Sequence, residues 1–297
     1  MNGFDRSIPF ADRIADRVRE TGSRLVVGLD PVVERFPSTV AELPIEEALV
    51  GFCQGILEAV RDEAAAVKPQ VAFFERHGWL GMRALVRVVE IAQKMGIPVI
   101  ADAKRGDIGS TAEAYAEAFL GEESGTPGPF VDALTVNPYL GSDSLEPFLK
   151  RVREGGRGLF VLARTSNPGG SEIQCRPEDP LPVFRQVARA ASGWGAGSKG
   201  ACGYHGVGLV AGATFPEELA QIRHDAPRSW LLIPGVGAQG GDINALRTAF
   251  DGEGLGGLVN SSRGVIYATA QGSQEWTEAV AEAARRTRQA IDEGVLN

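Results

Sequence analysis

The chain has 297 residues, of which 43% are hydrophobic and 23% charged, with 38 glycines and 17 prolines. This composition is typical of a folded globular protein and excludes a disordered or fibrous chain. The formal net charge of −8 argues against a nucleic-acid partner, because such binding needs a basic face. No apolar run approaches the roughly 18 residues that span a bilayer, and the first residues lack a signal-peptide core. We therefore expect neither a membrane protein nor a secreted one.

Cysteine and histidine are scarce. The three cysteines are scattered, odd in number and without CxxC spacing, so they indicate neither a disulfide framework nor a zinc cluster, and we expect a reducing cytoplasm. The three histidines show no evident partnership with a Ser or Cys nucleophile, which disfavours a hydrolase of the Ser-His or Cys-His type.

Eight short runs rich in Val, Ile and Leu predict strands at 25–30, 66–73, 98–103, 133–137, 158–163, 207–211, 230–234 and 255–260. Apolar residues at three- and four-residue spacing between them predict helices, as at 45–65, 80–94 and 214–224. Continuous apolar strands indicate burial on both faces, as in a parallel sheet. Eight strand-helix units favour an α/β fold of the closed (β/α)₈ barrel type, and we expect one catalytic domain over residues 1–297.

Three Gly-, Pro- and Ser-rich stretches, 121–129, 166–182 and 192–204, fall beside strand ends or after helices. None is long enough to separate two domains. The Gly-rich segment 193–197 is either a surface insertion, which we favour, or a mobile lid. The C-terminal run 274–292, with Arg285, Arg286 and Arg288, is expected to be a solvated helix that closes the barrel.

Charged residues gather at the predicted C-terminal strand ends, where barrel enzymes place their active sites. Asp30 ends the first strand, Lys68 lies in the second, and Asp102 and Lys104 end the third. Only five of the 30 basic residues are lysines, so a lysine within a strand pattern is unusual here. Alternation along a strand puts Asp102 and Lys104 on the same side, within reach of each other.

The alternative for this segment is a buried ion pair followed by a helix start. Residues 110–113 fit a capping box, with Asp107 favourable near the helix N-terminus. A buried salt bridge is often no more stabilising than apolar packing, so we favour a functional role for Asp102 and Lys104.

A Gly-rich loop, 234–242, follows the seventh predicted strand, and Arg263 follows the eighth. Barrels frequently bind phosphate with these two loops, and the forked guanidinium of arginine suits phosphate oxygens. The two features together predict a phosphorylated substrate. The alternative is a simple Gly-rich turn and a surface arginine.

The segment 102–108 has the pattern D-x-K-x-x-D-I and resembles the signature of the orotidine 5′-phosphate decarboxylase family. Asp30, Lys68, the loop 234–242 and Arg263 fall on matching strands in matching order, so the resemblance covers nearly the whole chain, and it is to the longer bacterial branch. Ser262 stands where a glycine usually precedes the arginine in the shorter form.

The resemblance implies decarboxylation of orotidine 5′-monophosphate (OMP) to UMP, the last step of de novo pyrimidine synthesis, with no metal or organic cofactor. Lys104 is the implied proton donor to C6 of the pyrimidine, and Asp102 would sit beside the substrate carboxylate. Lys68 would hold Asp102 and a ribose hydroxyl, and Asp30 would contact the ribose.

The same resemblance implies a homodimer in which Asp107, with Ile108 and Thr111, serves the neighbouring subunit's site. It also implies that Ser166 bonds the pyrimidine edge. Gln239 and Arg263 would grip the phosphate together with the loop at Gly237.

Three other functions stay open. A 3-keto sugar-phosphate decarboxylase or synthase shares the D-x-K-x-x-D pattern but uses Mg²⁺. A Schiff-base aldolase would use Lys104 as its nucleophile, although a paired Asp102 should keep that amine protonated. A barrel without catalytic activity would bind UMP without turnover.

Overall fold

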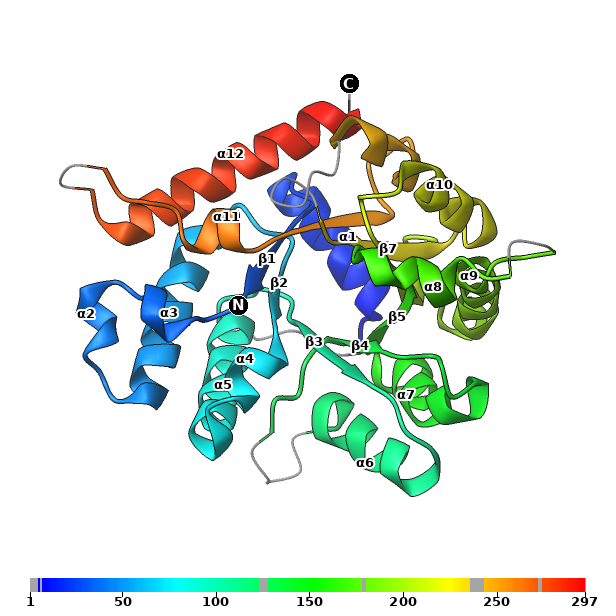
Figure 1. Cartoon of the computed structure of the whole chain (residues 1–297), viewed down its shortest axis with the longest axis horizontal. Coiled ribbons are helices and arrows are strands. Elements are labelled where there is room, and N and C mark those ends of the chain that lie inside the picture. Colours follow the sequence, from blue (N-terminus) through cyan, green and yellow to red (C-terminus); the bar gives the residue numbers. More distant parts are fainter. Residues whose placement is uncertain are drawn as a thin grey trace.

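The computed structural model describes residues 5, 7–122, 128–177, 180–235, 243–271 and 274–296. Eight strands alternate with helices along the chain, as predicted (Figure 1). The strands are β1 (Leu25–Leu29), β2 (Ala66–Pro69), β3 (Ile100–Arg105), β4 (Ala133–Val136), β5 (Gly158–Arg164), β6 (His205–Ala211), β7 (Ser229–Ile233) and β8 (Gly257–Ser261).

The strands form one parallel sheet in the order β2-β1-β8-β7-β6-β5-β4-β3. The two ends of this sheet meet, because isolated parallel bridges join Val67 to Val99 and Gln70 to Asp102. The result is the (β/α)₈ barrel that the sequence predicted. We call the end where the C-terminal strand ends meet the mouth, and the opposite end the base.

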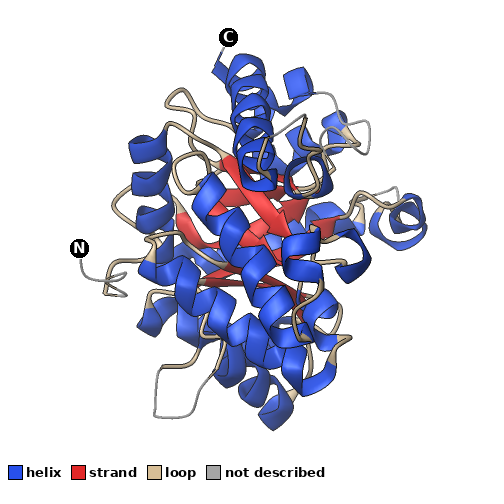
Figure 2. Ribbon diagram, turned by 90° about the vertical axis from the view of Figure 1, so that its left-hand side faces the viewer, coloured by secondary structure: helices blue, strands red, loops and turns tan. Residues whose placement is uncertain are grey.

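Helices surround the strands on the outside (Figure 2). The longer ones are α1 (Phe10–Thr21), α3 (Ile45–Val60), α5 (Gly78–Lys94), α6 (Gly109–Leu120), α7 (Ser142–Gly155), α9 (Val183–Gly195), α10 (Pro216–Asp225) and α12 (Trp276–Leu296). Shorter helical turns are η1 (Val33–Arg35), α2 (Ser38–Ala41), α4 (Val71–Glu75), η2 (Pro168–Gly170), α8 (Ser171–Gln174), η3 (Ala196–Ser198), η4 (Ile243–Ala249) and α11 (Arg263–Ile266).

Strand alternation divides the core into two layers. Outward residues such as Leu25, Val27 and Leu29 pack against the helices, whereas Val26 faces the barrel interior. The base is filled by large side chains, and the ring of Phe10 from α1 meets that of Phe160 edge-on, with centroids 6.0 Å apart. A Cβ at Gly158 would lie 2.3 Å from the Phe10 ring, so this glycine lets α1 close the base.

Some predicted boundaries were wrong. The strand predicted at 66–73 ends at Pro69, and helix α4 begins at Val71. Pro69 has no N–H to donate to a continued ladder, which fits a strand end. The Gly-rich segment 193–197 forms the end of α9 and the start of η3, and Gly195 packs against His205 at the first residue of β6. It therefore lies at the base, and the lid alternative is wrong.

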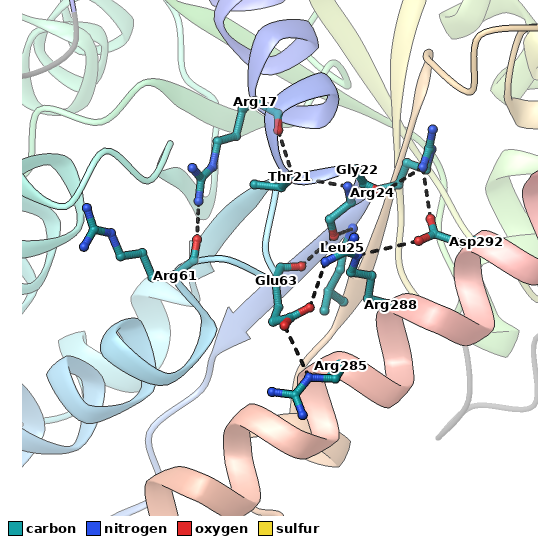
Figure 3. A network of polar contacts seen from close by, with 11 residues as sticks. Arg17, Thr21, Gly22, Arg24, Leu25, Arg61, Glu63, Arg285, Arg288 and Asp292 are labelled. Atoms are coloured by element: carbon teal, nitrogen blue, oxygen red, sulfur yellow. Dashed lines mark hydrogen bonds and ion pairs between the residues drawn. The ribbon is translucent and has the colours of Figure 1, made fainter.

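The C-terminal helix α12 is tied to the base by an ion-pair network (Figure 3). Arg24 lies 3.0 Å from Asp292, and Arg288 and Arg285 lie 3.0 and 3.5 Å from Glu63. The expectation of a solvated arginine face is therefore wrong for Arg288, whose side chain is only 30% exposed. Within the described ranges, no helix is both long enough and apolar enough to cross a membrane.

Candidate active site

The inward side chains of the last strand layer surround a cavity of about 330 Å³ at the mouth. Three of its walls are apolar, from β5, β6 and β7, whereas β2, β3, β4 and β8 contribute polar groups. The residues are Asp30, Lys68, Gln70, Asp102, Lys104, Thr135, Leu162, Thr165, Ser166, Asn167, Val210, Leu232, Pro234 and Asn260. Alternation along the strands places Asp30, Lys68 and Asp102 inward, and Lys104 lines the same cavity, so the four charged residues meet as the sequence predicted.

Asp102 is the centre of the polar cluster and receives four donors. Its Oδ2 lies 2.9 Å from Lys68 Nζ and accepts a hydrogen bond from Gln70 Nε2 at 3.0 Å. Its Oδ1 lies 2.5 Å from Lys104 Nζ and accepts a bond from the Thr135 hydroxyl at 3.0 Å. The carboxylate is thereby fixed in one orientation with both oxygens occupied.

Burial alone would raise the pKa of Asp102, but the charges of Lys68 and Lys104, with their hydrogen bonds, lower it well below its ordinary value of 3.8. The carboxylate is therefore ionised at neutral pH. Lys68 is nearly buried, with 6% of its side chain exposed, whereas the Lys104 side chain is 46% exposed and borders the cavity. Of the two lysines, Lys104 is therefore the one whose ammonium group is accessible to solvent and to a bound molecule.

Asp30 is held at the mouth by two side chains from the segment that follows β8. Ser262 Oγ donates to Asp30 Oδ2 at 2.6 Å, and the Tyr267 hydroxyl donates to the Asp30 carbonyl at 2.8 Å. A Cβ at Gly28 would lie 2.7 Å from the Ser262 Cβ, so the glycine in β1 makes room for this serine. Asp30 Oδ1 has no hydrogen-bond partner among the described residues, although it is buried, and it can accept one from a ligand hydroxyl.

Arg263 borders a second cavity of about 400 Å³, which shares Asp30, Pro234 and Asn260 with the first. The guanidinium is at the start of α11 and exposed. Gly237 and Gln239, the other predicted phosphate residues, lie outside the described residues.

Asp107, Ile108 and Thr111 do not line the cavity. Asp107 Oδ1 accepts the N–H of Ile108 at 2.8 Å, and the Ile108 side chain is 59% exposed. The capping box predicted at 110–113 is wrong, because α6 begins at Gly109 and no side chain caps it. Gly109 has a positive φ of 53°, a conformation that favours glycine. The helix thus starts one residue before Ser110, which the capping box would have placed at the N-cap.

Ser166 lines the cavity on the loop after β5, and buried Arg164 anchors this loop. Arg164 pairs with Glu218 at 2.5 Å, donates to the Thr165 carbonyl at 2.9 Å and lies 3.7 Å over the Phe215 ring. This network fixes the backbone from which Ser166 faces the cavity.

A family model described as "Orotidine 5'-phosphate decarboxylase / HUMPS family" matches residues 23–279. The chain belongs to this family. An orotidine 5′-phosphate decarboxylase of Rhodopirellula baltica is 42% identical over 286 residues, covering 91% of this chain and 95% of the relative. One of Haloarcula marismortui is 45% identical over 263 residues and 87% of each chain. The crystal structure of a putative orotidine 5′-phosphate decarboxylase from Streptomyces avermitilis has a TM-score of 0.82 at 37% identity, covering 98% and 97% of the two chains.

Three further residues of this orotidine 5′-phosphate decarboxylase family member belong to the site without having been predicted from the sequence: Gln70, Thr135 and Asn260. All three line the cavity, and the first two donate to Asp102. Alternation could have found Thr135 and Asn260, since each is the polar inward residue near the end of an otherwise apolar strand. Among the described residues, no three His, Cys, Asp or Glu side chains are grouped to hold a metal ion.

Proposed function

We infer that the chain decarboxylates orotidine 5′-monophosphate to UMP in pyrimidine biosynthesis. The observation that supports this most is the Lys68–Asp102–Lys104 cluster at one wall of a mouth cavity, in a chain 42% identical to a named decarboxylase over 91% of its length. The relatives described above also bear the decarboxylase name, and none bears that of a sugar-phosphate enzyme.

We propose roles for the cavity residues that follow from their charges. Breaking the C6–carboxylate bond releases CO₂ and leaves an electron pair on C6. The Lys104 ammonium stabilises this negative charge and then delivers its proton to C6, giving UMP, and solvent reprotonates the amine. Asp102 lies beside the substrate carboxylate, and their repulsion is relieved as CO₂ leaves. Lys68 neutralises Asp102 from the buried side.

The positions of other residues at the mouth suggest which of them bind the ribose, the pyrimidine edge and the phosphate. Asp30, with its free Oδ1, accepts a ribose hydroxyl, and Ser166 bonds the pyrimidine edge. Arg263 binds the phosphate together with Gln239 and the backbone at Gly237. Phosphate binding far from C6 supplies energy that orders the reacting centre.

We also propose a homodimer in which Asp107, Ile108 and Thr111 complete the partner subunit's site. The support is that these residues follow β3 at the mouth without lining their own cavity. Large exposed apolar side chains follow β3, β4 and β5 at the same end, which a second subunit would cover: Ile108, Tyr139, Leu140 and Ile173.

Mixing two inactive proteins tests this arrangement. If Asp107 acts in the partner's site, Lys104→Ala and Asp107→Ala subunits that exchange freely regain about a quarter of wild-type activity, since half of the dimers hold one intact site. If Asp107 acts in its own site, no mixed dimer has an intact site and no activity returns.

We further propose that the barrel is one catalytic domain and that it works in a reducing cytoplasm. Cys53, Cys175 and Cys202 are all free thiols, which suits that compartment.

The experiment that tests the function is an ultraviolet assay of OMP conversion to UMP by the purified chain, with and without EDTA. Equal turnover in both is expected. Turnover that EDTA abolishes would show that the decarboxylation needs a metal ion. Absence of both OMP turnover and UMP binding would point to the metal-dependent sugar-phosphate reaction, and UMP binding without any turnover would point to a barrel without catalytic activity.

A further inference from the structure

The pairing between β3 and β4 is interrupted beside Asp102 and Lys104. Ala101 pairs with Leu134, but the next pair is Arg105 with Val136, so three residues of β3 lie opposite Thr135 alone. Such a bulge bends a strand and leaves backbone groups outside the ladder. The backbone within the bulge therefore needs other partners.

Lys104 lies in this bulge and has a φ of 49°, the one positive φ of a non-glycine residue in the described part of the chain. A long side chain is uncommon in this left-handed region, and such a conformation persists only where the surroundings fix it. The unusual turn brings the Lys104 ammonium back to within 2.5 Å of Asp102 Oδ1.

The Thr135 side chain takes over the missing ladder contact. Its hydroxyl oxygen accepts the Lys104 backbone N–H at 3.0 Å and donates its own hydrogen to Asp102 Oδ1 at 3.0 Å. The Ala101 carbonyl is a more distant second acceptor at 3.5 Å. Thr135 is 1% exposed, so solvent does not compete for these bonds.

We propose that Thr135 is a positioning residue for the decarboxylation, because its single hydroxyl holds both the Lys104 backbone and the Asp102 carboxylate. This inference rests on the proposed function of the same site. The reaction requires the ammonium and the carboxylate in one fixed relation to C6, and small misplacements of reacting groups are costly. The three inward neighbours on the next strands, Leu162, Val210 and Leu232, show that an apolar residue suits this layer.

The test compares Thr135→Val with Thr135→Ser. Valine keeps the shape and the strand preference of threonine but loses the hydroxyl, whereas serine keeps the hydroxyl and loses a methyl group. We expect Thr135→Val to lower kcat by about 10- to 100-fold while KM changes by less than about threefold. Thr135→Ser should retain most of kcat.

A role in packing alone predicts the reverse order, since a buried valine fills the space of threonine and serine leaves a small gap. Affinity for UMP, which lacks the reacting carboxylate, should be unchanged in both variants. A Thr135→Val protein with kcat within about twofold of wild type would overturn the proposal. If this variant does not fold, Thr135→Ala against Thr135→Ser makes the same comparison, and equal kcat values would overturn it. Absence of wild-type turnover would instead refute the decarboxylase function.

Discussion

Asp102 and Asp132 are both buried aspartates with basic partners, but they lie at opposite ends of the barrel. Asp132 precedes β4 at the base, is 0% exposed, lies 2.5 Å from Arg13 and accepts the Val99 N–H at 2.9 Å. Asp102 lies at the mouth, with two lysines, an amide and a hydroxyl around it, and borders a cavity. A buried acid–base pair therefore ties two segments of the fold together at the base and borders an open cavity at the mouth.

Neutralising Asp102 should give the largest effect on activity. We expect Asp102→Asn to lower kcat by at least about 10³-fold, because the variant lacks the charge that pairs with Lys104 and that, in the proposed mechanism, opposes the substrate carboxylate. Steady-state OMP turnover measures this. A kcat near that of wild type would show that the Asp102 charge has no role in catalysis.

Neutralising Asp132 should instead affect stability. Asp132→Asn removes the carboxylate charge that pairs with Arg13 in the core, and breaking a buried pair typically costs about 3–5 kcal/mol. Urea denaturation should show this loss of unfolding free energy, while kcat of the folded protein stays within about threefold of wild type. A large fall in kcat without destabilisation would mean that the base is coupled to the chemistry.

Tyr267 allows a second test at the mouth, because it contacts the backbone of Asp30 and not its carboxylate. Its hydroxyl donates to the Asp30 carbonyl at 2.8 Å and accepts the Val32 N–H at 2.6 Å, while its ring stacks on Phe52. Burial raises the pKa of Tyr267 to about 12, so the hydroxyl stays protonated at neutral pH.

Tyr267→Phe keeps the ring and removes both bonds. We expect a loss of about 1–2 kcal/mol in unfolding free energy and a rise of about 3- to 10-fold in KM, with kcat little changed. Tyr115→Phe, which makes the same change at a half-buried tyrosine of α6, is the matched control. An unchanged KM in Tyr267→Phe would contradict the proposal that Asp30 binds the ribose.

The pH dependence of stability gives the smallest effect. The pKa of Asp102 in the folded chain is depressed below 3.8. Its contribution to stability is therefore complete above the unfolded pKa and is lost as pH falls from about 4 through the folded pKa. Urea denaturation of wild type and Asp102→Asn at pH 7, 5 and 3 should give equal differences at the first two values and a smaller difference at pH 3. A difference that already shrinks between pH 7 and 5 would contradict the depressed pKa.

Much of the fold and the acidic–basic cluster could be predicted from sequence, because both depend on strand periodicity. Period-two alternation places Lys68 and Asp102 inward, and eight apolar runs specify the barrel. Lys104 lies two residues after Asp102, but in the structure a bulge in β3 brings the two side chains together. Boundaries were less predictable, as at Pro69, where a short helix follows directly.

The supporting contacts could not be predicted, because they depend on packing between distant segments. The bulge in β3 appears only when its register against β4 is known, and the role of Thr135 depends on that register. Likewise, Ser262 reaches Asp30 across 232 residues of sequence, and Gly28 matters only because that serine lies against it. Local patterns contain no information on such pairs.

The central claim, that the Lys104 ammonium protonates C6, is tested most directly by OMP turnover of Lys104→Ala beside Lys94→Ala, a control at an exposed lysine of α5. UMP affinity and thermal unfolding establish that both variants are folded. We expect Lys94→Ala to match wild type and Lys104→Ala to lose at least about 10³-fold in kcat. Substantial turnover by a folded Lys104→Ala protein would contradict it.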